Sequence, residues 1–100
     1  MYINMGTAVG KPEAHAELLE ILHTLARESR SDDGCLSFYV FAGIEDPNHF
    51  TSQSMWESEA ALDAHMAADH TRAALAAAYP LLATEPKITA YAIEASKSYE

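Results

Sequence analysis

The stretch that decides the fold runs from Phe50 to His65 and reads Phe-Thr-Ser-Gln-Ser-Met-Trp-Glu-Ser-Glu-Ala-Ala-Leu-Asp-Ala-His. It predicts a short strand, Phe50 to Trp56, that passes directly into a helix. Ser58 is a good N-cap, and Glu59 suits the positive end of the helix dipole. The only tryptophan, Trp56, therefore stands at a strand–helix junction. Its large, mostly apolar indole with one N–H suits the wall of a pocket.

The segments before this stretch predict a strand, a helix and another strand. The first strand runs from Tyr2 to Val9, and the helix lies between Gly10-Lys11-Pro12-Glu13 and Ser31-Asp32-Asp33-Gly34. The next strand, Cys35 to Gly43, should form a hairpin with Phe50 to Trp56. Its alternation places one set of side chains on each face: Leu36, Phe38 and Val40 against Cys35, Ser37, Tyr39 and Phe41. Large apolar groups occur on both faces, so we expect both to be covered.

The segments after Trp56 predict a broken helix and a last strand. Leu62, His65 and Met66 share one helical face, and Asp69 can cap a continuation of the helix from His70. We therefore expect a kink or break near Asp69, with the helix ending at Pro80. The last strand runs from residue 87 to residue 95, and residues 96–100 form a polar tail. The chain reads as a single domain, residues 1–100.

The element order β-α-β-β-α-β predicts a ferredoxin-like α+β fold, an antiparallel sheet with helices on one face. The strands that carry apolar groups on both faces need a second cover. The simplest cover is another copy of the sheet, so we expect a symmetric homodimer.

Charge and composition limit the partners. The net charge is −9 and the pI is about 4.8, so the surface repels phosphate backbones and anionic lipids. We therefore expect no nucleic acid and no membrane as partner. We see neither a signal peptide nor an apolar run of transmembrane length, and we expect a cytoplasmic location.

Four motifs in order resemble one known family. Gly10-Lys11-Pro12-Glu13 resembles its "v-K-P-G" helix start, and Arg30 to Tyr39 resembles its "R-x-E-x-G-C-x-x-Y" hairpin entry. The stretch from Trp56 to His65 resembles "W-E-S…A-L-D-A-H", and Asp69-His70-Thr71 resembles "S-x-H-F". Together they resemble the antibiotic biosynthesis monooxygenase (ABM) family.

The resemblance implies a dimeric α+β barrel and a cofactor-independent monooxygenase that acts on an aromatic phenol or quinol with O₂. One departure is that the family usually has Glu two residues before the tryptophan, where this chain has Ser54. Haem-degrading relatives need an axial histidine on the second helix. The aligned position here is Leu75, so we expect no haem degradation.

The candidate catalytic residues are Asn4, Trp56, His65 and His70. Trp56 would stack on a flat substrate, or it packs in the core. Asn4 would hydrogen-bond a substrate carbonyl, or it is an exposed strand residue. His65 or His70 would accept the proton, because histidine titrates near neutrality, or either is a satisfied histidine at the core edge. The two histidines are five residues apart, which is not ligand spacing on one helical face, and we expect no metal or other cofactor.

Five residues are candidates for substrate binding: Tyr39, Phe41, Ser54, Arg72 and Tyr91. The three aromatic residues would line a cavity between sheet and helices, although aromatics on strands are more often plain core. Arg72 would pair with an anionic substrate group, or it is a solvated surface residue. Two rival functions stay open: a non-catalytic dimeric binding or stress-response module, and a small-substrate isomerase with a wet, charged pocket.

Overall fold

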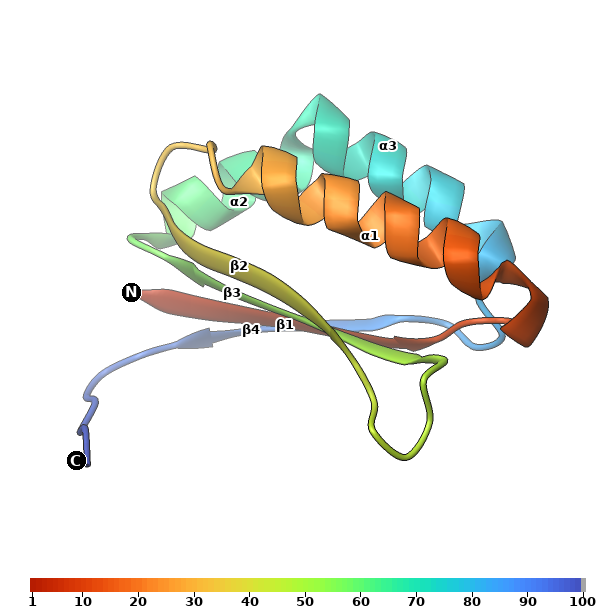
Figure 1. Ribbon diagram of the computed structural model, residues 1–100. Helices are drawn as coiled ribbons and strands as arrows, with labels where there is room; N and C mark the ends of the chain where they lie inside the picture. Colours follow the sequence, from red (N-terminus) through yellow and green to blue (C-terminus); the bar gives the residue numbers. More distant parts are fainter. Residues whose placement is uncertain (100) are drawn as a thin grey trace.

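The computed structural model describes residues 1–99, and Figure 1 shows one layer of helices on one layer of strands. The N-terminal half contains β1 (Tyr2–Val9), η1 (Pro12–Ala14), α1 (His15–Ser29) and β2 (Cys35–Ala42). The second half contains β3 (His49–Trp56), α2 (Glu59–Ala67), α3 (Asp69–Ala78), η2 (Tyr79–Leu81) and β4 (Lys87–Ala92). Glu100, the end of the predicted polar tail, lies outside the described residues.

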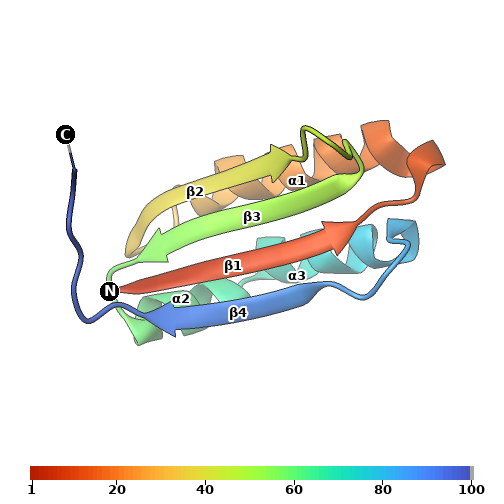
Figure 2. The same cartoon turned by 90° about the horizontal axis from the view of Figure 1, so that it is seen from below.

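The strands form an antiparallel sheet in the order β2-β3-β1-β4. Figure 2 shows that α1 lies behind β2 and β3, whereas α2 and α3 lie behind β1 and β4. The helices therefore cover one face only, which confirms the predicted ferredoxin-like α+β fold. The register pairs Tyr2 with Trp56 and Asn4 with Ser54, which sets these side chains on the helix-covered face near one end of the sheet.

The turn between α1 and β2 depends on a glycine. Gly34 has a φ of 79°, in the left-handed region that glycine adopts without strain. A Cβ at this position would lie 2.5 Å from the Cβ of Ala61 in α2, so close packing also excludes a larger residue. The turn thus brings the segment after α1 against the start of the second helical region.

The start of β2 differs from the simple alternation predicted for it. The pairing with β3 shifts between Cys35 and Ser37, because Cys35 pairs with Trp56 and Ser37 pairs with Met55. Such a bulge inserts one residue and changes which face the preceding side chain occupies. Cys35 accordingly packs against the core cluster that contains Trp56, and Leu36 is 49% exposed. Our assignment of Leu36 to the face of Phe38, and of Cys35 to the opposite face, was therefore wrong.

The predicted helix break is confirmed, and it lies one residue before the predicted position. Ala68 is extended, with φ −65° and ψ 146°, and it separates α2 from α3. Asp69 is the first residue of α3 and not its cap, and its side chain makes no capping hydrogen bond. Ser58 does cap α2 as predicted, because its hydroxyl accepts the Ala61 N–H at 3.1 Å. The break turns α3 relative to α2, so the two predicted histidines lie on different helices.

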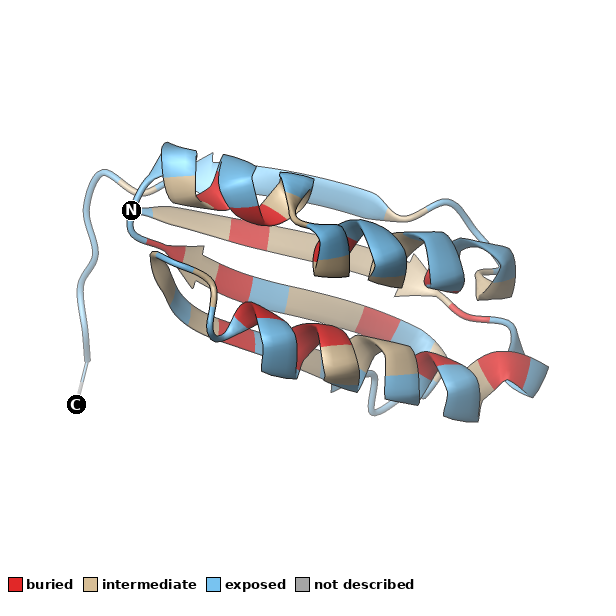
Figure 3. Ribbon diagram, turned by 90° about the horizontal axis from the view of Figure 1, so that it is seen from above, coloured by how far each residue is buried: buried red, intermediate tan, exposed pale blue. Residues whose placement is uncertain are grey.

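The buried residues gather between helices and sheet (Figure 3) in two clusters. The Trp56 cluster consists of Leu25, Ala26, Phe38, Trp56 and Leu62. The Leu18 cluster consists of Ala14, Leu18, Phe50 and Ala78. Within residues 1–99, no helix combines the length and apolar character that a membrane span requires.

Candidate functional site

Trp56 lies in the core and does not reach solvent. It is 0% exposed, and its Nε1–H donates to Ser54 Oγ at 2.9 Å. Ser54 Oγ in turn donates to the backbone carbonyl of Asn4 across the strand pair, at 3.4 Å. Asn4 is buried, with its Nδ2 4.0 Å from the sulfur of Met66. Ser54 therefore serves as the polar partner of the buried indole, in place of the acid that the resembled family carries there.

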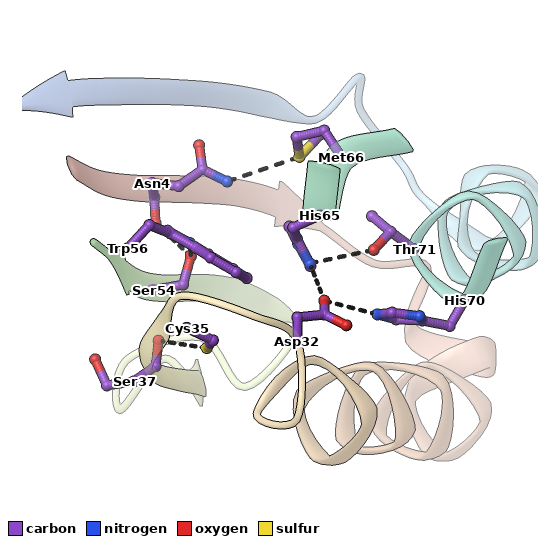
Figure 4. A network of polar contacts seen from close by, with 10 residues as sticks. All are labelled: Asn4, Asp32, Cys35, Ser37, Ser54, Trp56, His65, Met66, His70 and Thr71. Carbon is purple, nitrogen blue, oxygen red and sulfur yellow. Dashed lines mark hydrogen bonds and ion pairs between the residues drawn. The ribbon is translucent and has the colours of Figure 1, made fainter. Parts of the chain in front are cut away.

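A second polar group joins three separate segments (Figure 4). Asp32, in the turn after α1, accepts hydrogen bonds at one oxygen, Oδ2, from two imidazoles. His65 Nδ1 in α2 lies 2.8 Å from that oxygen, and His70 Nε2 in α3 lies 2.9 Å from it. Thr71 Oγ1 lies 3.3 Å from the same His65 nitrogen. We call Asp32, His65 and His70 the carboxylate–histidine cluster.

The tautomers of this cluster follow from the acceptor. A carboxylate oxygen offers only lone pairs, so each imidazole must carry a proton on the nitrogen that faces Asp32. For a neutral His65, this leaves Nε2 unprotonated and free to act as a base. Burial lowers the pKa of His65, and the hydrogen bond with Asp32 opposes that effect. The fold thus holds an oriented imidazole in the core, with a pKa below the ordinary histidine value.

The His65 ring also covers Trp56. The two ring centroids are 4.5 Å apart with an interplanar angle of 31°, and the ring of Phe38 lies 5.6 Å from His65 on another side. His65 is only 3% exposed. The indole face that we expected to stack on a substrate is therefore occupied by a side chain of the protein itself.

A cavity of about 80 Å³ lies elsewhere in the interior, between the sheet, α1 and α3. Its floor includes Gly6 and Ala8 of β1, and Leu18 and Leu22 of α1 form part of its wall. Leu75, the position aligned with a haem ligand, also lines it. Within residues 1–99, no charged side chain lines this cavity, and the hydroxyls of Thr7, Ser52 and Tyr79 are the polar side-chain groups along it. The remaining lining residues are Leu25, Val40, Phe50, Ala78, Leu82, Pro86 and Ile88.

The structure does not bring all predicted site residues together. Tyr39 and Tyr91 are 52% and 55% exposed and do not line the interior cavity. Phe41 is 51% exposed and borders a separate pocket of about 340 Å³ between α1 and β2. Arg72 is exposed on α3. By contrast, Asn4, Ser54 and Trp56 form one hydrogen-bonded chain, and His65 lies against its indole.

Asp32 is the functional candidate that sequence reasoning missed. It stood in a Ser-Asp-Asp-Gly segment, where the composition indicates only a helix stop. The available signal was its place at the acidic position of the "R-x-E-x-G-C" pattern, three residues before Cys35. We expected no metal site because His65 and His70 do not have ligand spacing along one helix. The break at Ala68 places the two histidines on different helices, so that argument does not apply.

Fold and interior together define the class of protein: a ferredoxin-like α+β domain with an apolar cavity under its helices. A family profile described as antibiotic biosynthesis monooxygenase matches residues 1–77. The chain belongs to the antibiotic biosynthesis monooxygenase family.

Solved structures agree with this assignment. A protein of Deinococcus radiodurans, assigned provisionally to the antibiotic biosynthesis monooxygenases, is 31% identical and has a TM-score of 0.94. That match covers 100% of this chain and 99% of the other. A similarly assigned Caulobacter crescentus protein is 25% identical, with a TM-score of 0.85 and coverage of 93% and 90%.

A curated relative is longer than the region it shares with this chain. An uncharacterised Synechocystis protein is 29% identical over 83 residues, which are 83% of this chain. The matched region spans 56% of the Synechocystis protein, a little over half of its length.

Proposed function

We propose that this protein is a cofactor-independent monooxygenase that acts on a small planar phenol or quinol. The observation that carries the proposal is the apolar cavity of about 80 Å³ between the sheet and the helices. Apolar walls suit a flat aromatic ring, and family membership supports oxygenation as the reaction. In this reaction the substrate anion supplies the electrons to O₂. One oxygen atom enters the substrate, and the other leaves as water.

Binding a substrate ring requires side chains to move. An apolar cavity of about 150 Å³ is known to accept benzene, so 80 Å³ is too small for a substituted ring at rest. Tyr79 and Ile88, which are 55% and 43% exposed, border the cavity and can turn outward. Leu25 lines the cavity and also belongs to the Trp56 cluster, so it is shared by the two regions.

We assign the proton acceptor to the carboxylate–histidine cluster. Asp32 fixes the His65 tautomer with its free nitrogen, Nε2, available as a base. His70 is the more accessible member, because its side chain is 22% exposed. Either histidine would take the phenolic proton once the substrate displaces the Leu25 side chain. Asn4 would then orient a substrate oxygen, although its amide now faces Met66.

Oxygen uptake with a panel of quinols and polyphenols tests the proposal. The matched variants are Ala78→Leu, which replaces a methyl group that borders the cavity, and Ala77→Leu, the same change at the exposed neighbour. We expect the wild type and Ala77→Leu to consume oxygen well above background, and Ala78→Leu to lose most of that activity. Background uptake by folded wild-type protein across the whole panel would contradict the proposal.

The second candidate function is a non-catalytic binding module. One observation favours it: none of Asn4, Trp56, His65 and His70 lines the cavity. A module of this kind would show a ligand-induced rise in melting temperature, abolished by Ala78→Leu, without oxygen uptake. The isomerase alternative gains no support, because no charged side chain among the described residues 1–99 lines the cavity.

We also propose that the sheet face opposite the helices packs against a second copy of the chain. Tyr39, Phe41 and Tyr91 are each about half exposed, and β4 is exposed along its whole length. Patches of this kind mark interaction surfaces. Light scattering after size exclusion should give twice the 10.9 kDa chain mass, and Tyr39→Lys with Tyr91→Lys should reduce it. A stable wild-type monomer would contradict this.

A further inference from the structure

The carboxylate–histidine cluster has the composition and arrangement of a metal site. Its three potential ligand atoms, Asp32 Oδ2, His65 Nδ1 and His70 Nε2, all lie within 4.8 Å of one another. We propose that Asp32, His65 and His70 bind a divalent transition-metal ion of the zinc class. This proposal does not rest on the oxygenase proposal. A bound ion would leave the outer ring nitrogens of His65 and His70 protonated, so metal binding competes with the proton-acceptor role assigned to these histidines above.

The distances in the cluster are close to those of a ligand set. A zinc ion lies about 2.0–2.1 Å from imidazole nitrogen and carboxylate oxygen, so neighbouring ligand atoms are roughly 3 Å apart. The Asp32 oxygen is already 2.8 Å from the His65 nitrogen and 2.9 Å from the His70 nitrogen. The two imidazole nitrogens lie within 4.8 Å of one another, so an ion that replaces the two hydrogen bonds requires the side chains to rotate until all three ligand atoms surround it. The two imidazole protons then move to the opposite ring nitrogens.

The ligand chemistry selects the kind of ion. Two imidazoles and one carboxylate suit Zn²⁺, Co²⁺ and Ni²⁺, whereas Mg²⁺ and Ca²⁺ require mostly oxygen ligands. A fourth position would be filled by water, which can reach the site because Asp32 and His70 are 19% and 22% exposed. The net charge of −9 also favours a cation over an anion at this partly open edge.

A buried hydroxyl at the end of α1 has no hydrogen-bond partner. Ser29 Oγ is the one buried side-chain oxygen without a hydrogen-bond partner in the described part of the chain. Ser29 is 0% exposed, and its carbonyl accepts the Asp32 N–H at 3.0 Å. Ser29 thus stands three residues before Asp32 at the end of α1. Buried hydroxyls normally find partners, so its hydroxyl has an unused donor and acceptor.

Metal binding would join three parts of the fold. Asp32 belongs to the α1–β2 turn, His65 to α2 and His70 to α3, so one ion would tie the turn to both sides of the break at Ala68. At this point the two hydrogen bonds of Asp32 join the three segments. The ion would therefore raise thermal stability, and it would do so only when all three side chains are present.

Competition between the tag-free, full-length protein and a chromogenic zinc chelator tests the site. We expect one Zn²⁺ per chain, and a visible absorption band when Co²⁺ is added in its place. The test variant is His70→Gln, because His70 is partly exposed and its loss should leave the fold intact. The matched control is His23→Gln, an exposed histidine on α1. Circular dichroism checks that both variants fold.

The expected results separate a built site from surface binding. His70→Gln and Asp32→Asn should each weaken zinc affinity by at least about 100-fold, whereas His23→Gln should leave it unchanged. Zinc should raise the melting temperature of the wild type and of His23→Gln, and Mg²⁺ should not. Equal zinc affinity in the wild type and His70→Gln, or no stoichiometric binding by the wild type, would overturn the proposal.

Discussion

The two ends of the helix–sheet interface are built on opposite principles. At one end, Trp56 fills the space, its N–H is satisfied by Ser54, and His65 covers its ring. At the other end, Gly6, Ala8 and Ala78 contribute almost no side chain, and a cavity remains between them. The first end is filled and polar, and the second is partly empty and apolar. The comparison shows that the cluster of Asp32, His65 and His70 lies apart from the apolar cavity.

Removal of the indole should have the largest effect on this contrast. Trp56→Ala takes the largest fully buried side chain from the filled end and exposes His65 to a void. We expect the free energy of unfolding to fall by about 3–5 kcal/mol, measured by urea denaturation. Trp56→Phe, which keeps much of the ring but loses the N–H, should cost clearly less. Equal losses in the two variants would mean that the hydrogen bond, and not ring packing, dominates this end.

Loss of the shared carboxylate should rank second. Asp32→Ala leaves the His65 and His70 donors without their acceptor, and His65 is buried. We expect a decrease of about 2–3 kcal/mol in the free energy of unfolding, because hydrogen bonds to charged groups are the stronger ones. Asp33→Ala, the same change at the exposed neighbour, is the control and should have little effect. A similar loss in both variants would indicate that the hydrogen bonds of Asp32 contribute no more to stability than an exposed aspartate does.

The serine pair on β3 compares the two ends directly. Ser54→Ala removes the acceptor of the Trp56 N–H and should cost about 1–2 kcal/mol. Ser52→Ala makes the same change two residues away on the same face, where the hydroxyl borders the cavity, and it should cost less. Denaturation of the two variants side by side gives the difference. A larger cost for Ser52→Ala would reverse our view of which end depends on polar contacts.

The smallest expected effect is a pH dependence of stability from His65. Burial lowers its pKa in the folded protein, so the unfolded chain takes up a proton first as the pH falls. The free energy of unfolding should therefore be highest above the ordinary histidine pKa of about 6.5 and decrease below it. Unfolding in chelator-treated buffer between pH 7.5 and 5.5 measures the slope. His65→Gln should flatten it, whereas His23→Gln should keep it.

Local signals in the sequence predicted most of the fold. The Trp56 junction, the Ser58 cap and the break near Asp69 each rest on a few adjacent residues, and the structure has all three within one residue. The bulge at Leu36 was missed because apolar residues occur on both faces of this strand. A shift of one residue therefore does not change the hydrophobic pattern of the sequence.

The interior was less predictable because it depends on distant residues. Asp32 and His65 are 33 positions apart and come into contact only in the folded protein, so neither motif alone predicts their hydrogen bond. The cavity results from small residues on different elements, such as Gly6 and Ala78. No local sequence pattern predicts that the space between them stays open. Trp56 and His65 were identified as candidates, but their contact with one another was not foreseen.

The contact between Trp56 and His65 gives the molecule a built-in optical reporter. Trp56 is the only tryptophan, so the indole fluorescence of each chain arises at a single place. That place is 4.5 Å, ring to ring, from the imidazole that hydrogen-bonds Asp32. Emission intensity will therefore respond to protonation or displacement of His65 without any added dye. The cavity near Ala78 has no such fluorophore, so a change confined to that end will leave the emission largely unaltered.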